Sequence, residues 1–196
     1  YWLPSNRDGD VIGAIFENGN VTVPPSMKKA TDILIESGLT TLFGHQKYGG
    51  MEFPNVLSVF ADEISCATNM SLGIYLGLTK GAYNCIYSHG SEELKETYLP
   101  RFLTGEWFGT MCLTEAHSGT DLGLIRTSAK PVGDSYNLNG QKIFISCGEH
   151  NLSENIIHLV LARLPDAPKG VKGISLFIVP KFLVNDDGTL GERNKV

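Results

Sequence analysis

Apolar residues in the first half of the chain recur every three or four positions, which is the spacing of a helix with one buried face. The first such stretch covers residues 23–38, where Pro24 and Pro25 open a helix and Gly38 follows its end. The residues that lie roughly on one face of it are Met27, Ala30, Leu34 and Ser37. Before about Asn20 the sequence shows no such period and is expected to be irregular.

Two more helical stretches follow Pro54. In the first, opposite Asp62 and Glu63, the apolar positions at helical spacing are Val56, Phe60, Ile64 and Ala67. The second, residues 69–90, is apolar nearly all round and predicts a helix buried on most sides. Its smooth face is formed by Gly73, Gly77 and Gly81. Such a strip suits close packing of another backbone, and contact with a flat ligand is the alternative.

A fourth helix is predicted within residues 90–107. Ser91 is a good N-cap, and the acidic pair Glu92-Glu93 suits the positive end of the helix. Pro100 is expected to interrupt or restart this helix.

From Gly105 onward the chain consists of short runs rich in Val, Ile, Phe and Thr, which is typical of strands. These runs are residues 107–115, 127–132, 136–148, 155–164 and 173–180. Asn139-Gly140, between two alternating segments, predicts a hairpin turn. The sequence therefore predicts an α+β fold, with an all-α domain over residues 1–108 and a β-domain over residues 109–196 that the chain end truncates.

Composition and charge exclude some classes of protein. With 42% hydrophobic and 19% charged residues, the 196-residue chain has a globular composition, enough for one large domain or two small ones. A formal charge of −5 with scattered basic residues argues against a nucleic-acid surface. No apolar run approaches the roughly 20 residues of a membrane-spanning helix.

The cysteines are too widely spaced for a zinc or dithiol redox site, and they are Cys66, Cys85, Cys112 and Cys147. Reduced thiols and no signal peptide predict a cytoplasmic protein. Because the chain starts at Tyr1 and stops in a loop-like stretch, we interpret it as part of a longer protein. The sequence has no GxGxxG after a strand, no P-loop, no GxSxG and no HExxH motif.

The stretch MCLTEAHSGTDLG, residues 111–123, is a strand end that opens into small and turn-forming residues. Such a loop can present backbone N–H groups to one acceptor-rich ligand edge. The hydroxyls of Thr114, Ser118 and Thr120 add to these donors, and Asp121 can hold the loop in shape through local backbone bonds.

A second run, QKIFISCG (residues 141–148), is predicted to place Phe144 and Ser146 on the same face of a strand. A ring that stacks and a hydroxyl that donates suit a planar heterocycle. An ordinary glycine-rich turn beside a core phenylalanine is the simpler alternative.

Together these two segments resemble the paired signatures of the acyl-CoA dehydrogenase family, in the right order and spacing. YGG at residues 48–50, residues 89–107 and the apolar helix before them look like the helical N-terminal domain of that family. The resemblance implies a helical domain, a β-barrel-like middle domain and a C-terminal four-helix domain, the last of which is absent from this chain. It also implies FAD as cofactor.

By this resemblance, the flavin would be lined by Met111, Cys112, Leu113, Thr114, Gly119, Thr120, Phe144, Ile145 and Ser146. Thr114 would bond near the pyrimidine end, Ser146 would donate to flavin N5, and Thr120 would meet the acyl-CoA. Glu115 belongs to the signature and is interpreted as structural. The catalytic base is expected in the missing C-terminal domain, so no catalytic residue is assigned here.

The family reaction converts an acyl-CoA to its trans-2-enoyl-CoA and passes electrons to an electron-transferring flavoprotein. A homo-oligomer, dimer or tetramer, is implied. The alternatives are an acyl-CoA oxidase on the same fold and a non-catalytic flavin- or acyl-CoA-binding module. The chain alone is expected to be inactive and to bind FAD weakly.

Two positions depart from the usual family pattern. Ala116 stands where many members have proline, and Phe144 stands where many have tryptophan. Residues 148–194 resemble a narrower branch that includes bacterial 3-methylmercaptopropionyl-CoA dehydrogenases.

Overall fold

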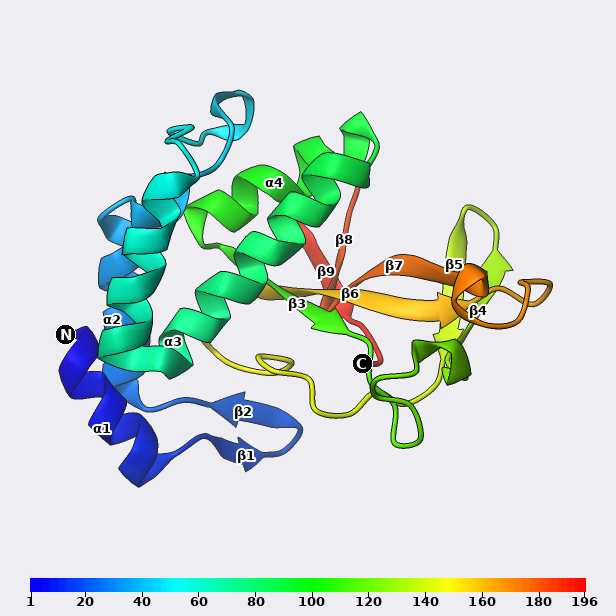
Figure 1. Cartoon of the computed structure of the whole chain (residues 1–196), viewed down its shortest axis with the longest axis horizontal. Coiled ribbons are helices and arrows are strands. Elements are labelled where there is room, and N and C mark those ends of the chain that lie inside the picture. Colours follow the sequence, from blue (N-terminus) through cyan, green and yellow to red (C-terminus); the bar gives the residue numbers. More distant parts are fainter.

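The computed structural model describes residues 1–196, and its helices gather on one side of a strand-rich half (Figure 1). The helices are α1 (Trp2–Ile12), α2 (Pro25–Glu36), α3 (Val56–His89) and α4 (Glu92–Thr104). The principal strands are β3 (Trp107–Cys112), β4 (Ser128–Val132), β5 (Ser135–Asn139), β6 (Asn155–Arg163) and β7 (Ile174–Pro180). Two short pairs complete the strands: β1 (Ile15–Glu17) with β2 (Asn20–Thr22), and β8 (Phe182–Val184) with β9 (Leu190–Arg193).

Strand β6 is the centre of a five-stranded sheet. It pairs in parallel with β3 along one edge and antiparallel with β7 along the other, while β4 joins it only at the Ser128–Arg163 pair. All but two of its nine residues are buried, in keeping with its continuous apolar sequence. The β4–β5 hairpin therefore lies at the end of the sheet away from the helices (Figure 1).

The helical and strand-rich halves meet where α3 crosses β3. The backbone N–H of Gly109 in β3 donates to the Thr79 hydroxyl of α3 at 3.1 Å. A side chain at Gly109 would bring its Cβ to 2.4 Å from Ala82 Cβ, so only glycine allows this approach. Trp107, fully buried next to it, packs in the core that α3 and α4 share with the sheet. This contact fixes the start of β3, and β3 leads directly into the loop at residues 113–123.

Helix α3 is two helices joined at Asn69, whose backbone (φ −157°, ψ 92°) is not helical. The Asn69 side chain accepts a hydrogen bond from Leu72 N at 3.1 Å, so it caps the second half, and its amide donates to Ser5 Oγ at 2.9 Å. The predicted division into two helical stretches is thus confirmed as a kink. No helix, α3 included, combines the length and apolar character needed to cross a membrane.

The helix α2 prediction is confirmed, and so is the cap of α4, where Ser91 Oγ accepts from Leu94 N at 3.3 Å. Pro100 lies within α4 without breaking it, contrary to the prediction. The expectation that residues before Asn20 are irregular was also wrong, because α1 and the first strand form there. Tertiary contacts explain α1: its Gly9 leaves room for the Met27 thioether, and Ser5 is buried against Asn69.

The predicted turn at Asn139-Gly140 is wrong, since the hairpin turns at Gly133-Asp134 instead. Gly133 has φ 57°, as the first residue of a type II′ turn requires. Gly140 is required for close packing rather than for a turn. A Cβ there would lie 2.3 Å from Thr127 Oγ1, so the chain passes close to Thr127 as it leaves β5.

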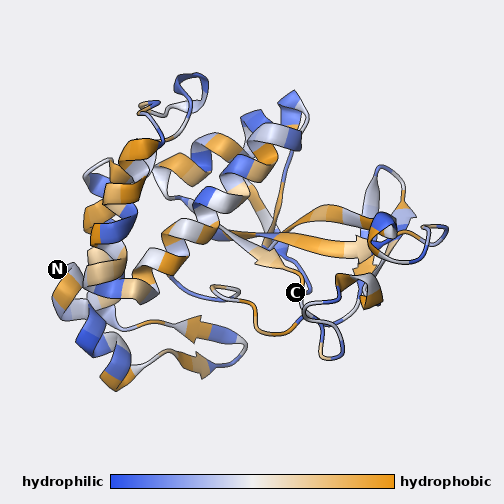
Figure 2. Cartoon of the chain, viewed as in Figure 1, coloured by the Kyte–Doolittle hydropathy of each residue, from blue (hydrophilic) through white to orange (hydrophobic).

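The second half of α3 is buried on one side only, and hydrophobic positions recur along both halves (Figure 2). A Cβ at Gly73 would lie 3.2 Å from Cys66 Sγ in the first half of the helix, whereas a Cβ at Gly77 or Gly81 would meet no atom within 4 Å, so within this chain the packing interpretation of the glycine strip holds at Gly73 alone. The apolar positions of the first half are exposed too: Val56 by 67%, Phe60 by 60% and Ile64 by 65%.

Candidate functional site

The two segments singled out in the sequence lie against each other. Ile143 N donates to the carbonyl of Thr114 at 3.0 Å, and the Thr110 hydroxyl donates to the carbonyl of Ser146 at 2.8 Å. Lys142 Nζ reaches the Leu113 carbonyl at 2.9 Å. Residues 142–146 therefore run beside the end of β3 and the start of the loop, so the two motifs form one site.

The second segment is not a strand, which corrects the prediction that Phe144 and Ser146 share a strand face. Strand β5 ends at Asn139, and Phe144 and Cys147 adopt the left-handed backbone conformation with φ 55° and 60°. For a bulky residue this conformation is uncommon, and such residues cluster at functional sites. It leaves the Phe144 ring 89% exposed beside the first segment, rather than in the core.

Glu115 anchors the loop from beneath. Its carboxylate is buried and accepts hydrogen bonds from Arg126 N at 2.7 Å, from Thr127 N at 2.9 Å and from the Thr127 hydroxyl at 2.6 Å. Lys142 Nζ adds an ion pair at 2.9 Å. Burial alone would raise the pKa of Glu115, but the hydrogen bonds from Thr127, Arg126 and Lys142 outweigh it and lower the pKa to about 2. The structural role inferred for Glu115 fits this geometry.

This lowered pKa predicts an acid-sensitive loop. A carboxyl whose pKa drops from 4.5 to about 2 on folding stabilises the protein fully above pH 4.5, and that stabilisation is lost as the pH falls towards 2. We expect the free energy of unfolding, measured by urea denaturation at several pH values between 5 and 2.5, to fall more steeply in the wild type than in Glu115→Gln. Equal slopes in the two proteins would contradict this role for Glu115.

Local hydrogen bonds shape the rest of the loop. Asp121 Oδ1 accepts from Gly123 N at 3.0 Å, and the Ser118 hydroxyl donates to the Asp121 carbonyl at 2.7 Å. Glu115 and Ser118 also exchange two backbone hydrogen bonds across the turn. Asp121 holds the loop in shape as predicted, whereas the Ser118 hydroxyl serves the fold and is not available to a ligand.

Three hydroxyls of the predicted site, those of Thr114, Thr120 and Ser146, have no hydrogen-bond partner in the chain and are not buried. Gly119 and Thr120 are exposed at the loop tip, while Met111, Leu113 and Ile145 are half-buried. Cys112 is buried, and burial raises the pKa of its thiol to about 11. The structure therefore leaves free donors and one exposed ring on two segments that lie side by side, next to a buried thiol with a raised pKa.

Sequence reasoning missed four side chains that support the site: those of Thr110 and Lys142 hold the two segments together, and those of Thr127 and Arg163 hold the loop of the first segment. Two of these side chains could have been found from the sequence, because each is a basic residue next to apolar residues. Lys142 precedes Ile143, and Arg163 ends the apolar run of β6. A lone basic residue in such a position has to find a partner, because a buried unpaired charge is costly.

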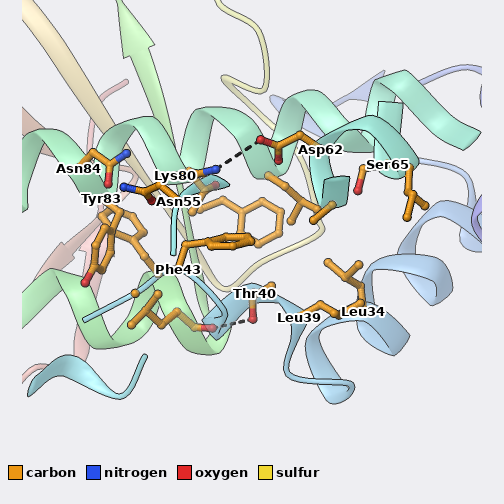
Figure 3. Close-up of a pocket in the computed structure, with 18 of the residues that line it drawn as sticks. Leu34, Leu39, Thr40, Phe43, Asn55, Asp62, Ser65, Lys80, Tyr83 and Asn84 are labelled. Atoms are coloured by element: carbon orange, nitrogen blue, oxygen red, sulfur yellow. Dashed lines mark hydrogen bonds and ion pairs between the residues drawn. The ribbon is translucent and has the colours of Figure 1, made fainter. Parts of the chain in front are cut away.

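A separate apolar cavity of about 530 Å³ lies in the helical half, between α2, α3 and the chain that joins them (Figure 3). Lys80 lies at its edge, where its ammonium group pairs with Asp62 at 3.3 Å and sits 4.8 Å from the centre of the Phe43 ring. None of the residues predicted for the flavin site lines this cavity. The cavity and the two-segment site are thus distinct features of the chain.

Comparison with known proteins matches the two halves of the chain to two adjacent family domains. Residues 16–106 match "Acyl-CoA dehydrogenase, N-terminal domain", and residues 110–194 match "Acyl-CoA dehydrogenase, middle domain". The 3-methylmercaptopropionyl-CoA dehydrogenase of Ruegeria pomeroyi is 46% identical over 97% of this chain and 33% of its own length. The chain therefore spans about a third of that relative.

Solved structures agree with this match. Butyryl-CoA dehydrogenase from Megasphaera elsdenii superposes with a TM-score of 0.75 at 26% identity, covering 99% of this chain and 55% of its own. An acyl-CoA dehydrogenase from Bacillus anthracis, solved in complex with FAD, gives a TM-score of 0.66 at 27% identity, covering 79% of this chain and 25% of its own.

Proposed function

This chain belongs to the acyl-CoA dehydrogenase family, and on that premise we propose that the protein containing it is an FAD-dependent enzyme that oxidises an acyl-CoA to the trans-2-enoyl-CoA. An electron-transferring flavoprotein would accept the electrons. The chain supplies an N-terminal and a middle domain, divided near residue 108, and the rest of the protein supplies the C-terminal helices.

One observation carries this proposal. Two segments that are distant in sequence meet along one edge, which offers the exposed Phe144 ring and the unpaired hydroxyls of Thr114 and Ser146. An isoalloxazine ring is flat, with hydrogen-bonding heteroatoms along its rim, so it needs a stacking surface beside donors. The residues present fit this group. The smaller ring of phenylalanine, compared with tryptophan, reduces the stacking area and lacks the indole N–H donor, while the hydroxyl donors of Thr114 and Ser146 remain.

We assign the binding roles as follows. Met111, Cys112 and Leu113 form the wall at the end of β3, and Phe144 and Ile145 form the stacking wall. Thr114 would donate near the pyrimidine end and Ser146 would donate towards N5, while the tip residues Gly119 and Thr120 would face the cofactor and the acyl-CoA. Bound FAD supplies the hydride acceptor, which no side chain provides. The donors along its edge favour the negative charge that builds there on reduction.

The catalytic base belongs to the part of the protein outside this chain. Glu115 is the acidic residue of the loop, but its carboxylate already accepts four hydrogen bonds and is buried beneath the backbone. A carboxylate held in this way, with its pKa lowered to about 2, is a poor proton acceptor.

For the substrate we propose a short acyl chain, with 3-methylmercaptopropionyl-CoA as the first to try. The support is the 46% identity to the enzyme of that name. The narrower resemblance of residues 148–194 points in the same direction.

Steady-state turnover of the full-length protein tests this function. We expect yellow protein with bound FAD, bleaching of the flavin absorbance on anaerobic addition of 3-methylmercaptopropionyl-CoA, and rapid reoxidation by an electron-transferring flavoprotein but slow reoxidation by air. Rapid turnover with O₂ alone would make the protein an oxidase. Binding of FAD and acyl-CoA with no bleaching by any acyl-CoA would make it a binding module.

A further inference from the structure

Arg163, the last residue of β6, places its guanidinium group on backbone carbonyls. Nε donates to the Ile125 carbonyl at 2.9 Å and Nη2 donates to the Gly123 carbonyl at 2.6 Å. Nη1 donates to the Gly170 carbonyl at 2.9 Å and contacts the Pro168 carbonyl at 3.3 Å. No carboxylate pairs with this cation, although other Lys and Arg side chains of the chain form nine salt bridges within 4.0 Å. The guanidinium therefore joins two loops, residues 123–125 and residues 168–170.

The surrounding backbone leaves a space of the right size for this group. A Cβ on Gly173 would lie 2.9 Å from Arg163 Nη1 and 1.8 Å from the Pro168 carbonyl, so only glycine fits there. A Cβ on Gly123 would lie 3.5 Å from Gly170 Cα, so the two loops approach backbone to backbone. The Arg163 amide also donates to the Thr127 carbonyl at 2.9 Å, which fixes the start of its side chain.

These contacts complete the support of the loop at its second end. Glu115 binds the amides of Arg126 and Thr127, while Arg163 binds the carbonyls of Gly123 and Ile125 just before them. The segment between these anchors carries the exposed tip with Gly119 and Thr120. Its position depends on where residues 123–125 are held.

We propose that Arg163 is a positioning residue that sets where Thr120 meets the acyl-CoA, an assignment that rests on the function proposed above. Arginine suits this task because its planar group offers five donors in fixed directions. A lysine has three donors on a single nitrogen and cannot reach carbonyls on both loops in the same way.

The test compares Arg163→Met and Arg163→Lys with Arg126→Met in the full-length holoenzyme. Arg126 is the matched control, because it lies on the same segment, is exposed and makes no side-chain hydrogen bond. Two measurements are needed: amide hydrogen exchange of peptides covering residues 119–125 without substrate, and steady-state kinetics with the acyl-CoA.

For Arg163→Met we expect exchange in residues 119–125 to accelerate about tenfold or more, and KM for the acyl-CoA to rise about tenfold with a smaller change in kcat. A tenfold rise in KM corresponds to the loss of about 1.4 kcal/mol of binding that the ground state and the transition state share. In both measurements, Arg163→Lys should lie between Arg163→Met and the wild type. If Arg163→Met does not fold, Arg163→Lys takes its place and should exchange faster and have a higher KM than the wild type. Arg126→Met should match the wild type.

Unchanged exchange, faster exchange with unchanged KM, or an equal effect of Arg126→Met would overturn the proposal. A wild-type protein that binds no FAD and oxidises no acyl-CoA would refute the proposed function instead. The exchange result would still show whether Arg163 holds the loop.

Discussion

Glu115→Ala in the full-length protein is expected to abolish FAD retention and to lower the free energy of unfolding by about 3–5 kcal/mol. The substitution leaves the Lys142 ammonium without its carboxylate, and only 10% of the Lys142 side chain is exposed. It also leaves the Thr127 amide and hydroxyl without an acceptor, in a place where Thr127 is buried. Both segments of the site then lose their common anchor.

Flavin absorbance after gel filtration and urea denaturation followed by circular dichroism check this expectation. Glu154→Ala is the matched control, since Glu154 is exposed, lies just before β6 and makes no side-chain hydrogen bond. Lys142→Met should lose part of the stability, and the double variant Glu115→Ala/Lys142→Met should lose less than the sum of both. Full FAD retention in Glu115→Ala would refute the anchoring role.

Gly109→Val is expected to prevent folding, with Gly109→Ala as the milder version that costs about 1–3 kcal/mol or more. The added Cβ would lie 2.4 Å from Ala82 Cβ and 3.4 Å from Thr79 Cα, between a helix and a strand that are both packed in the core. Neither side can move without breaking the joint between α3 and β3, because Ala82 is fully buried.

Thermal denaturation checks this prediction, and two further variants sharpen it. Gly77→Ala lies on the same helix α3, where a Cβ meets nothing within 4 Å, so it should stabilise the protein by up to about 1 kcal/mol. Ala82→Gly should partly rescue Gly109→Ala by restoring the space. If Gly109→Ala is as stable as the wild type, the close contact does not exist in solution.

Local signals in the sequence were sufficient to predict most of the longer helices and strands. Helix α2 follows from its prolines and its period, α4 follows from Ser91, and β6 and β7 follow from their apolar runs. Helix α1 was not predicted because Gly9 and Asp10 are poor helix formers. The helix is stabilised by its contacts with α2 and α3 instead.

The site could be predicted from the sequence less completely than the helices and strands. Sequence reasoning chose two segments that the structure brings together, but it gave Phe144 an extended backbone, since an alternating apolar run looks the same whether or not it pairs with a neighbouring strand. No neighbouring strand takes up residues 141–148, and hydrogen bonds to Thr110 and Thr114 shape them instead. Those partners lie about 30 residues away in sequence, so no local signal could reveal them.

The parallel pairing of β3 with β6 has a consequence for how the protein folds. Every residue assigned to the flavin after Cys112 lies in the stretch between these two neighbouring strands, residues 113–154. Closing so long a loop costs chain entropy before the contacts inside it form, and non-local parallel pairing is intrinsically slow. We expect the binding loop to order only after β6 has docked on β3, so that a chain still emerging from the ribosome cannot hold the cofactor until residue 160 or so has been released.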